Sequence, residues 1–154
     1  AASILLTPYR TLTLPLRDDH TRNPLHSVHV CGWLDAATCR QHIEAAEQHA
    51  SLHGGWRTAR HRNYATTDLD VTTVPTLRES IPERVRAQLL PTLATLFGVP
   101  VARLSTGEIF IVKYAAAANE QRELGAHRDG STFSFNALLS DPANAFEGGG
   151  TSFG

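Results

Sequence analysis

The residues of this chain best suited to metal chemistry are a histidine and an aspartate two positions apart, His127 and Asp129. In an extended segment, residues i and i+2 project from the same side of the backbone, so both side chains can reach one ion. They supply two of the three donors of the 2-His-1-carboxylate arrangement, which holds a non-haem Fe(II) and leaves positions open for O2 and a cosubstrate. Taken alone, such a pair is more often a solvated surface pair. The sequence therefore predicts two-thirds of an iron site, with no third ligand identified.

Three consecutive glycines, Gly148 to Gly150, follow this pair. Glycine permits tight turns and close approach of backbones. A phosphate loop would need a following Lys-Ser/Thr and a helix, whereas residues 151–153 have strand character. We interpret the run as a turn before a strand, for which a plain hairpin is an equally good explanation.

Two strand patterns flank the pair and would position it. Residues 109–114 are β-branched and aromatic with a period of two, which predicts a strand. Residues 131–139 alternate as well, with Phe133 and Phe135 on one face and Asn136 on the other. A third strand is predicted to begin at Thr151. The pair would then lie at the mouth of a barrel.

Two helices are predicted before these strands. Residues 36–50 carry an apolar stripe of Cys39, Ile43, Ala46 and Ala50 after Asp35 as the N-cap, and residues 53–55 end this helix. The second helix opens at residues 80–83 as a capping box and stops at residues 98–100. Pro91 lies inside it, so a kink or two short helices is as plausible as one rod.

Length and composition predict one folded domain. The 154 residues, 42% of them hydrophobic, are enough for a single core. Residues 1–30 have weak patterns, with possible edge strands at 4–6 and 12–16, and are interpreted as an N-terminal arm to a domain over 31–154. A net charge of -1 disfavours nucleic acid as a partner, and the apolar stretches are far shorter than a membrane span.

Four motifs in the C-terminal third resemble one family when taken in order. They are Ile111-Val112-Lys113-Tyr114, His127-x-Asp129, Phe135-Asn136-x-Leu138-Leu139-Ser140-Asp141 and Phe146-Glu147-Gly148-Gly149-Gly150-Thr151-x-Phe153. Their order and spacing are similar to those of the prolyl 4-hydroxylase-like group of Fe(II)- and 2-oxoglutarate-dependent dioxygenases. The resemblance is specific over residues 105–154 and diffuse before them.

The resemblance implies an α+β fold: a double-stranded β-helix, or jelly roll, with supporting helices from the N-terminal half, here incomplete. His127 and Asp129 would be the first two metal ligands. Tyr114 and Thr151 would contact the carboxylate of 2-oxoglutarate, and Asn136 would line the pocket. For Tyr114 a half-buried strand aromatic, and for Asn136 a cross-strand hydrogen bond, are equally good explanations.

The resemblance also implies the chemistry and its cofactors. Fe(II), 2-oxoglutarate and O2 would hydroxylate an unactivated C–H bond of a peptidyl (prolyl or lysyl) or small-molecule substrate, releasing succinate and CO2, with ascorbate restoring oxidised iron. The family's distal histidine and its following Lys or Arg would fall after Gly154. We therefore expect this chain to be a fragment that binds iron weakly and turns over nothing.

Two alternatives stay open at this point. The chain could be a non-catalytic jelly-roll binding module in which the His-x-Asp pair is residual. The polar residues of 60–68, which include Arg60, His61 and Asp68, could belong to a substrate-facing loop, although local turn and capping hydrogen bonds are the more frequent explanation for such a cluster.

Overall fold

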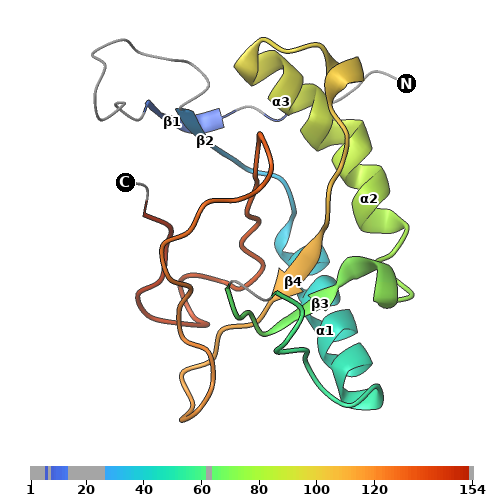
Figure 1. Ribbon diagram of the computed structural model, residues 1–154, viewed down its shortest axis with the longest axis vertical. Helices are drawn as coiled ribbons and strands as arrows, with labels where there is room; N and C mark the ends of the chain where they lie inside the picture. The colour runs from blue at the N-terminus through green and yellow to red at the C-terminus, as the bar shows by residue number, and fades with distance from the viewer. Residues whose placement is uncertain (1–5, 7, 14–26, 62–63, 153–154) are drawn as a thin grey trace.

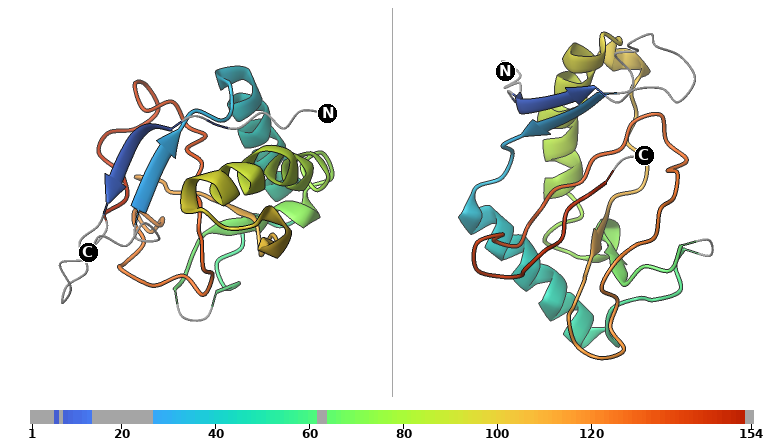
Figure 2. Two further views of the ribbon diagram at one scale, coloured as in Figure 1. Left: turned by 90° about the horizontal axis from the view of Figure 1, so that it is seen from above. Right: turned by 90° about the vertical axis from the view of Figure 1, so that its left-hand side faces the viewer.

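The structure, a computed structural model, describes residues 6, 8–13, 27–61 and 64–152. It mixes helices with two small antiparallel sheets, and residues 113–152 return across the molecule as long loops (Figure 1, Figure 2). The predicted mixture of helix and strand is confirmed at this level. None of the helices in the described ranges is both long and apolar enough to cross a membrane.

Helix α1 (Ala36–Leu52) is confirmed with its predicted cap. The Asp35 carboxylate accepts a hydrogen bond of 2.7 Å from the Thr38 N–H, which satisfies a donor that has no partner inside the helix. After the helix, Gly54 and Gly55 have φ values of 84° and 94°, which favour glycine. The boundaries of this helix could therefore be read from its capping residues.

The buried face of α1 differs slightly from the predicted stripe. Ala46 and Ala50 are buried as expected, but the third buried residue is His42, whereas Cys39 and Ile43 are half-buried. Burial lowers the pKa of His42, and the charge of Arg84 lowers it further. The fold thus favours the neutral imidazole.

The lowered pKa of His42 predicts a loss of stability in mild acid. The unfolded chain takes up a proton at this residue near pH 6.5, while the folded chain resists it. Stability from this group is therefore complete above about pH 6.5 and decreases as the pH falls toward the lower folded-state pKa. Urea unfolding across this range should show the decrease, and His42→Leu should reduce it. An unchanged pH dependence in His42→Leu would contradict this assignment.

A single helical run covers residues 80–97. The sequence had not distinguished between one continuous helix, a kinked helix and two short helices here. The run consists of α2 (Ser80–Arg84), the π-helical segment η3 (Val85–Leu89) and α3 (Leu90–Phe97). The Leu90 N–H bonds to Val85 O, five residues back, immediately before Pro91. This wider turn lies where proline lacks an N–H, so the helix continues through it. Gly98, with φ 65°, ends the run.

The capping box predicted at Ser80 and Glu83 is wrong. Ser80 lies inside the helix, and its hydroxyl donates a 3.0 Å hydrogen bond to Thr76 O. The preceding turn leads directly into the helix, because Ile81 N–H already bonds to Leu77 O at 3.1 Å. Backbone carbonyls thus satisfy the donors that a side-chain cap would have served.

Two strand pairs are present among the described residues. Strands β1 (Pro8–Thr13) and β2 (Ser27–Cys31) pair antiparallel, as do β3 (Asp68–Asp70) and β4 (Phe110–Val112). Strand β4 confirms the centre of the strand predicted over 109–114, and β1 overlaps the second edge strand predicted in the arm. The predictions over 4–5 and 14–16 lie outside the described residues. Short 3-10 turns, η2 (Val71–Thr73) and η4 (Val101–Arg103), connect the other elements.

The strand predicted over 131–139 is not formed, although all of these residues are described. The alternation of its side chains is nevertheless present. Phe133 contacts the ring of Phe97, with centroids 4.7 Å apart, and Phe135 contacts Trp33 at 6.0 Å, while Asn136 is exposed. A period of two determines which side chains face the core, but a strand also needs a neighbouring edge with which to pair. Residues 151–152 likewise carry no strand, and 153–154 lie outside the described residues.

The core lies between α1, the β3–β4 pair and the start of the helical run. Its buried apolar residues are Ala46, Ala50, Leu69, Val71, Val74, Leu77, Ile81 and Val85. Phe135 packs on this core from the C-terminal loops. Each sheet of the described chain has two strands, which is fewer than a jelly roll contains. The expected jelly roll therefore stays a prediction.

Candidate functional site

The predicted metal pair lies on the loops after β4, where its two side chains face each other. His127 Nε2 is 3.2 Å from Asp129 Oδ1, and the side chains are 27% and 51% exposed. Two donors bound to one ion at about 2.1 Å stand about 3.0 to 3.4 Å apart, depending on the coordination geometry. The spacing therefore suits two neighbouring metal ligands as well as a direct ion pair.

The backbone orients the imidazole of His127. Its Nδ1 lies 2.9 Å from Gly125 O, a group that only accepts, so Nδ1 carries the proton of this hydrogen bond. Nε2 then keeps its lone pair 3.2 Å from a carboxylate oxygen, a contact that is favourable only with a cation beside both groups. That cation is either a proton on Nε2 or a metal ion. Metal-binding histidines typically donate their other N–H to a carbonyl in this way.

The two donors fit part of a facial triad. Within the described ranges, no three His, Cys, Asp or Glu side chains gather closely enough to hold a metal together. His127 and Asp129 thus provide two adjacent positions on an ion, and the nitrogen and oxygen donors are of the kind Fe(II) accepts.

The three residues predicted to contact 2-oxoglutarate are at the surface. Tyr114 lies two residues after the end of β4 and is 48% exposed, and burial of the remainder raises the pKa of its phenol. Asn136 and Thr151 are exposed. In the described chain none of the three shares a hydrogen bond, ion pair or ring contact with His127 or Asp129. Their roles stay predictions.

A polar network fixes the strand that leads to Tyr114. Lys113 Nζ donates a 2.6 Å hydrogen bond to Glu47 Oε1 on α1, and Trp56 Nε1 donates one of 3.1 Å to Glu47 Oε2. The ammonium also lies 5.4 Å from the centre of the Trp56 ring, within the range of a cation–π interaction. The end of β4 is therefore held against α1.

The chain bends at residues 147–148, where the glycine run begins, but the turn and the following strand predicted here are not formed over residues 148–152. Gly148, Gly149 and Gly150 have φ values of 76°, 78° and 110°, which L side chains rarely adopt. A Cβ on Gly149 would also approach the Phe146 ring to 3.0 Å. Glycine is required here by the backbone.

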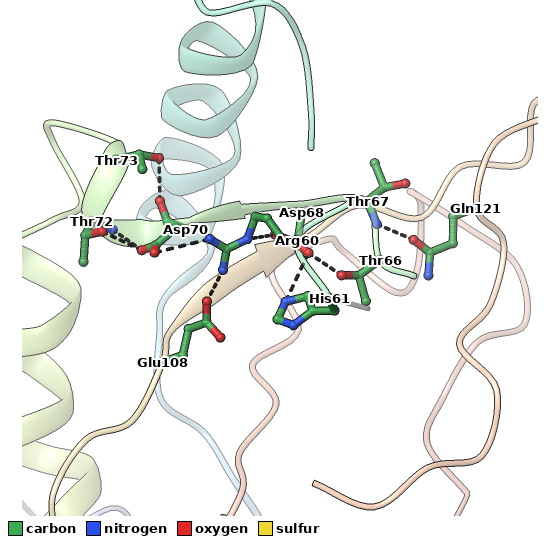
Figure 3. Close-up of polar contacts among 10 residues, drawn as sticks. All are labelled: Arg60, His61, Thr66, Thr67, Asp68, Asp70, Thr72, Thr73, Glu108 and Gln121. Atoms are coloured by element: carbon green, nitrogen blue, oxygen red, sulfur yellow. Dashed lines mark hydrogen bonds and ion pairs between the residues drawn. The ribbon is translucent and has the colours of Figure 1, made fainter. Parts of the chain in front are cut away.

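The polar cluster over residues 60–68 is a long-range ion-pair network (Figure 3). Asp68 is fully buried and accepts hydrogen bonds from Arg60 and Thr66, and His61 Nε2 lies 3.4 Å from its Oδ2. Arg60 also pairs with Asp70, at 3.3 Å, and with Glu108. Four of these contacts are local, but the pair with Glu108 joins this loop to the entry of β4. These bonds account for most of the polar groups of the cluster, and the substrate-facing role stays a prediction.

The charged groups of this network stabilise each other's ionised forms. Burial works against the guanidinium of Arg60, but the carboxylates of Asp68 and Glu108 outweigh that cost and raise its pKa. Burial also works against the charge of Asp70, while hydrogen bonds from Thr72 and the charge of Arg60 lower the pKa of this carboxyl. Both groups therefore stay ionised in the fold.

Sequence reasoning missed one contact of the metal pair. The ring of Tyr64 packs in a tilted arrangement against the imidazole of His127, with centroids 4.8 Å apart and planes inclined by 41°. The two residues are far apart in sequence, and neither pattern nor spacing relates them. Proximity of the two segments could have been found only from a fold.

Comparison of the chain with protein-family models, with curated proteins and with solved structures finds no match.

Proposed function

We propose that this chain carries part of the active site of an Fe(II)- and 2-oxoglutarate-dependent dioxygenase of the prolyl 4-hydroxylase-like type. The observation that carries the proposal is the 3.2 Å approach of His127 Nε2 to Asp129 Oδ1, with Nδ1 occupied by Gly125 O. An oriented imidazole lone pair beside a carboxylate is the donor set of such an iron site. The substrate class is a peptidyl prolyl or lysyl side chain or a related small molecule.

The chain's own groups would bind and orient the metal. His127 Nε2 and Asp129 Oδ1 would occupy adjacent positions, and Gly125 O would hold the ring in the required tautomer. When bound, iron and 2-oxoglutarate supply the oxidising chemistry, in which O2 and 2-oxoglutarate yield succinate, CO2 and one hydroxyl group on the substrate. Ascorbate would keep the iron reduced. Tyr114 and Thr151 are proposed to bind the cosubstrate carboxylate, and Asn136 to line the pocket.

The proposed enzyme fold is a double-stranded β-helix that includes β3 and β4. The bonds from Lys113 N–H to Thr67 O and from Val71 N–H to Ile109 O use one edge of β4. Because strand hydrogen bonds alternate in direction, the amides of Phe110 and Val112 point to the other edge. That edge could accept a further strand of a larger sheet, which supports the proposal.

The test is an anaerobic titration of the chain with Fe(II) and 2-oxoglutarate. Chelation of the iron by 2-oxoglutarate at this site should give a weak visible charge-transfer band that is lost in His127→Ala. Absence of the band in the wild-type chain, or its persistence in His127→Ala, would overturn the proposal and favour a non-catalytic binding module.

A further inference from the structure

We infer that Tyr64 is a positioning residue for His127, held in place by a bridge through the side chain of Gln121. The inference rests on the proposed function, because the purpose of the arrangement is to present Nε2 toward Asp129. Tyr64 itself does not contact Asp129 through any hydrogen bond, ion pair or ring contact of the described chain. It acts through the imidazole.

The first step is the constraint on the ring. Rotation of an imidazole about its side-chain bonds is limited by contacts at its edge and at its face. For His127, Nδ1 lies 2.9 Å from Gly125 O, and the Tyr64 ring packs against the imidazole with centroids 4.8 Å apart and planes inclined by 41°. Aromatic pairs within this range attract one another beyond their burial of area. Together the two contacts hold the ring with Nε2 3.2 Å from Asp129 Oδ1.

The second step is the constraint on Tyr64. Its segment is tied to the segment that carries His127 by the Gln121 side chain, whose amide oxygen accepts from Thr67 N–H (Figure 3). The amide nitrogen of the same side chain donates to Ala65 O and to Glu123 O, both at 3.2 Å. The backbone bond from Ala115 N–H to Gln121 O, 2.9 Å, anchors the bridge to the end of β4. One side chain therefore satisfies backbone groups on both segments and sets their separation.

The third step is the anchor behind Tyr64. Thr66 donates to the buried Asp68, and Lys113 N–H donates to Thr67 O at 2.8 Å, so the residues after Tyr64 are fixed to both strands. Tyr64 is 41% exposed, and its ring makes no contribution to the buried core. Replacement of this ring should therefore affect the pair far more than it affects stability.

The experiment compares the wild-type chain with Tyr64→Leu, Tyr64→Phe and Gln121→Ala. Imidazole C–H resonances of His127, assigned by their loss in His127→Ala, report directly whether an aromatic ring covers it. The ring-current shift should persist in Tyr64→Phe and disappear in Tyr64→Leu, which retains apolar bulk. Affinity for Co(II) should fall about 10-fold in Tyr64→Leu, as for loss of an outer partner of a metal ligand, and be retained in Tyr64→Phe. Gln121→Ala should weaken both readouts.

The outcomes distinguish a failure of the positioning role of Tyr64 from a failure of the proposed metal site. Loss of the ring-current shift in Tyr64→Leu with unchanged Co(II) affinity would overturn the positioning role while leaving the proposed function intact. An unshifted His127 resonance in the wild-type chain would overturn the contact itself. Failure of the wild-type chain to bind Co(II) would overturn the proposed function, and the role of Tyr64 with it. A fall in the free energy of unfolding of Tyr64→Leu that parallels the loss of affinity would reduce the residue to a structural one.

Discussion

Alanine at position 129 is expected to abolish specific binding of a divalent metal by this chain. Asp129 supplies the only carboxylate of the described chain that is paired with His127, at 3.2 Å from Nε2. Removal leaves a single neutral imidazole, which holds a hydrated ion poorly. We expect affinity for Co(II) to fall by more than about 100-fold in Asp129→Ala and in His127→Ala, beyond the range typical of outer-shell partners.

The controls separate coordination from general charge. Glu120→Ala removes an exposed carboxylate from the same loops and should leave Co(II) affinity unchanged. Both side chains are at least a quarter exposed, so the variants should keep the far-ultraviolet circular dichroism of the wild type. Equal affinity in wild type and Asp129→Ala, measured by titration calorimetry, would identify the pair as an ordinary ion pair.

The largest loss of stability is expected for Asp68→Ala. This carboxylate is fully buried and accepts hydrogen bonds from Arg60 and Thr66. Removing it leaves the half-buried guanidinium of Arg60 without its innermost partner. Breaking a buried pair from one side typically costs about 3 to 5 kcal/mol, and we expect the free energy of unfolding in urea to fall by that order.

Glu108 provides a matched control for this prediction. It pairs with the same guanidinium, but its side chain is 49% exposed. Exposed pairs contribute about 0 to 1 kcal/mol, so Glu108→Ala should be nearly neutral. Comparable losses in the two variants would show that the burial of Asp68 does not determine its contribution.

Much of the local structure could be predicted because its causes are local. The N-cap at Asp35, the glycines after α1 and the positive φ of Gly98 each act within one turn of the chain. The centre of β4 was predictable from its β-branched and aromatic residues. The capping box at Ser80 failed because the preceding turn already supplied backbone acceptors.

The parts that failed depend on partners distant in sequence. The alternation over 131–139 correctly gave Phe133 and Phe135 a buried side, but pairing depends on an available strand edge. Arg60 was recognised as part of a polar cluster, yet its bond to Glu108 joins residues 48 positions apart. The tilted ring contact between Tyr64 and His127 likewise joins residues far apart in sequence. For the candidate site, the spacing in the sequence predicted that His127 and Asp129 lie together, but not which other side chains contact them.

The three carboxylates around Arg60 also determine how this region can open. A planar guanidinium offers donors in a fixed fork, and here they are directed at Asp68, Asp70 and Glu108. Lysine would present one compact charge and could not serve all three directions. Separating the loop from β3 would leave the buried carboxylate of Asp68 without its guanidinium partner. We therefore expect the loop and β3 to open together, so that their amide protons exchange with solvent through one shared opening.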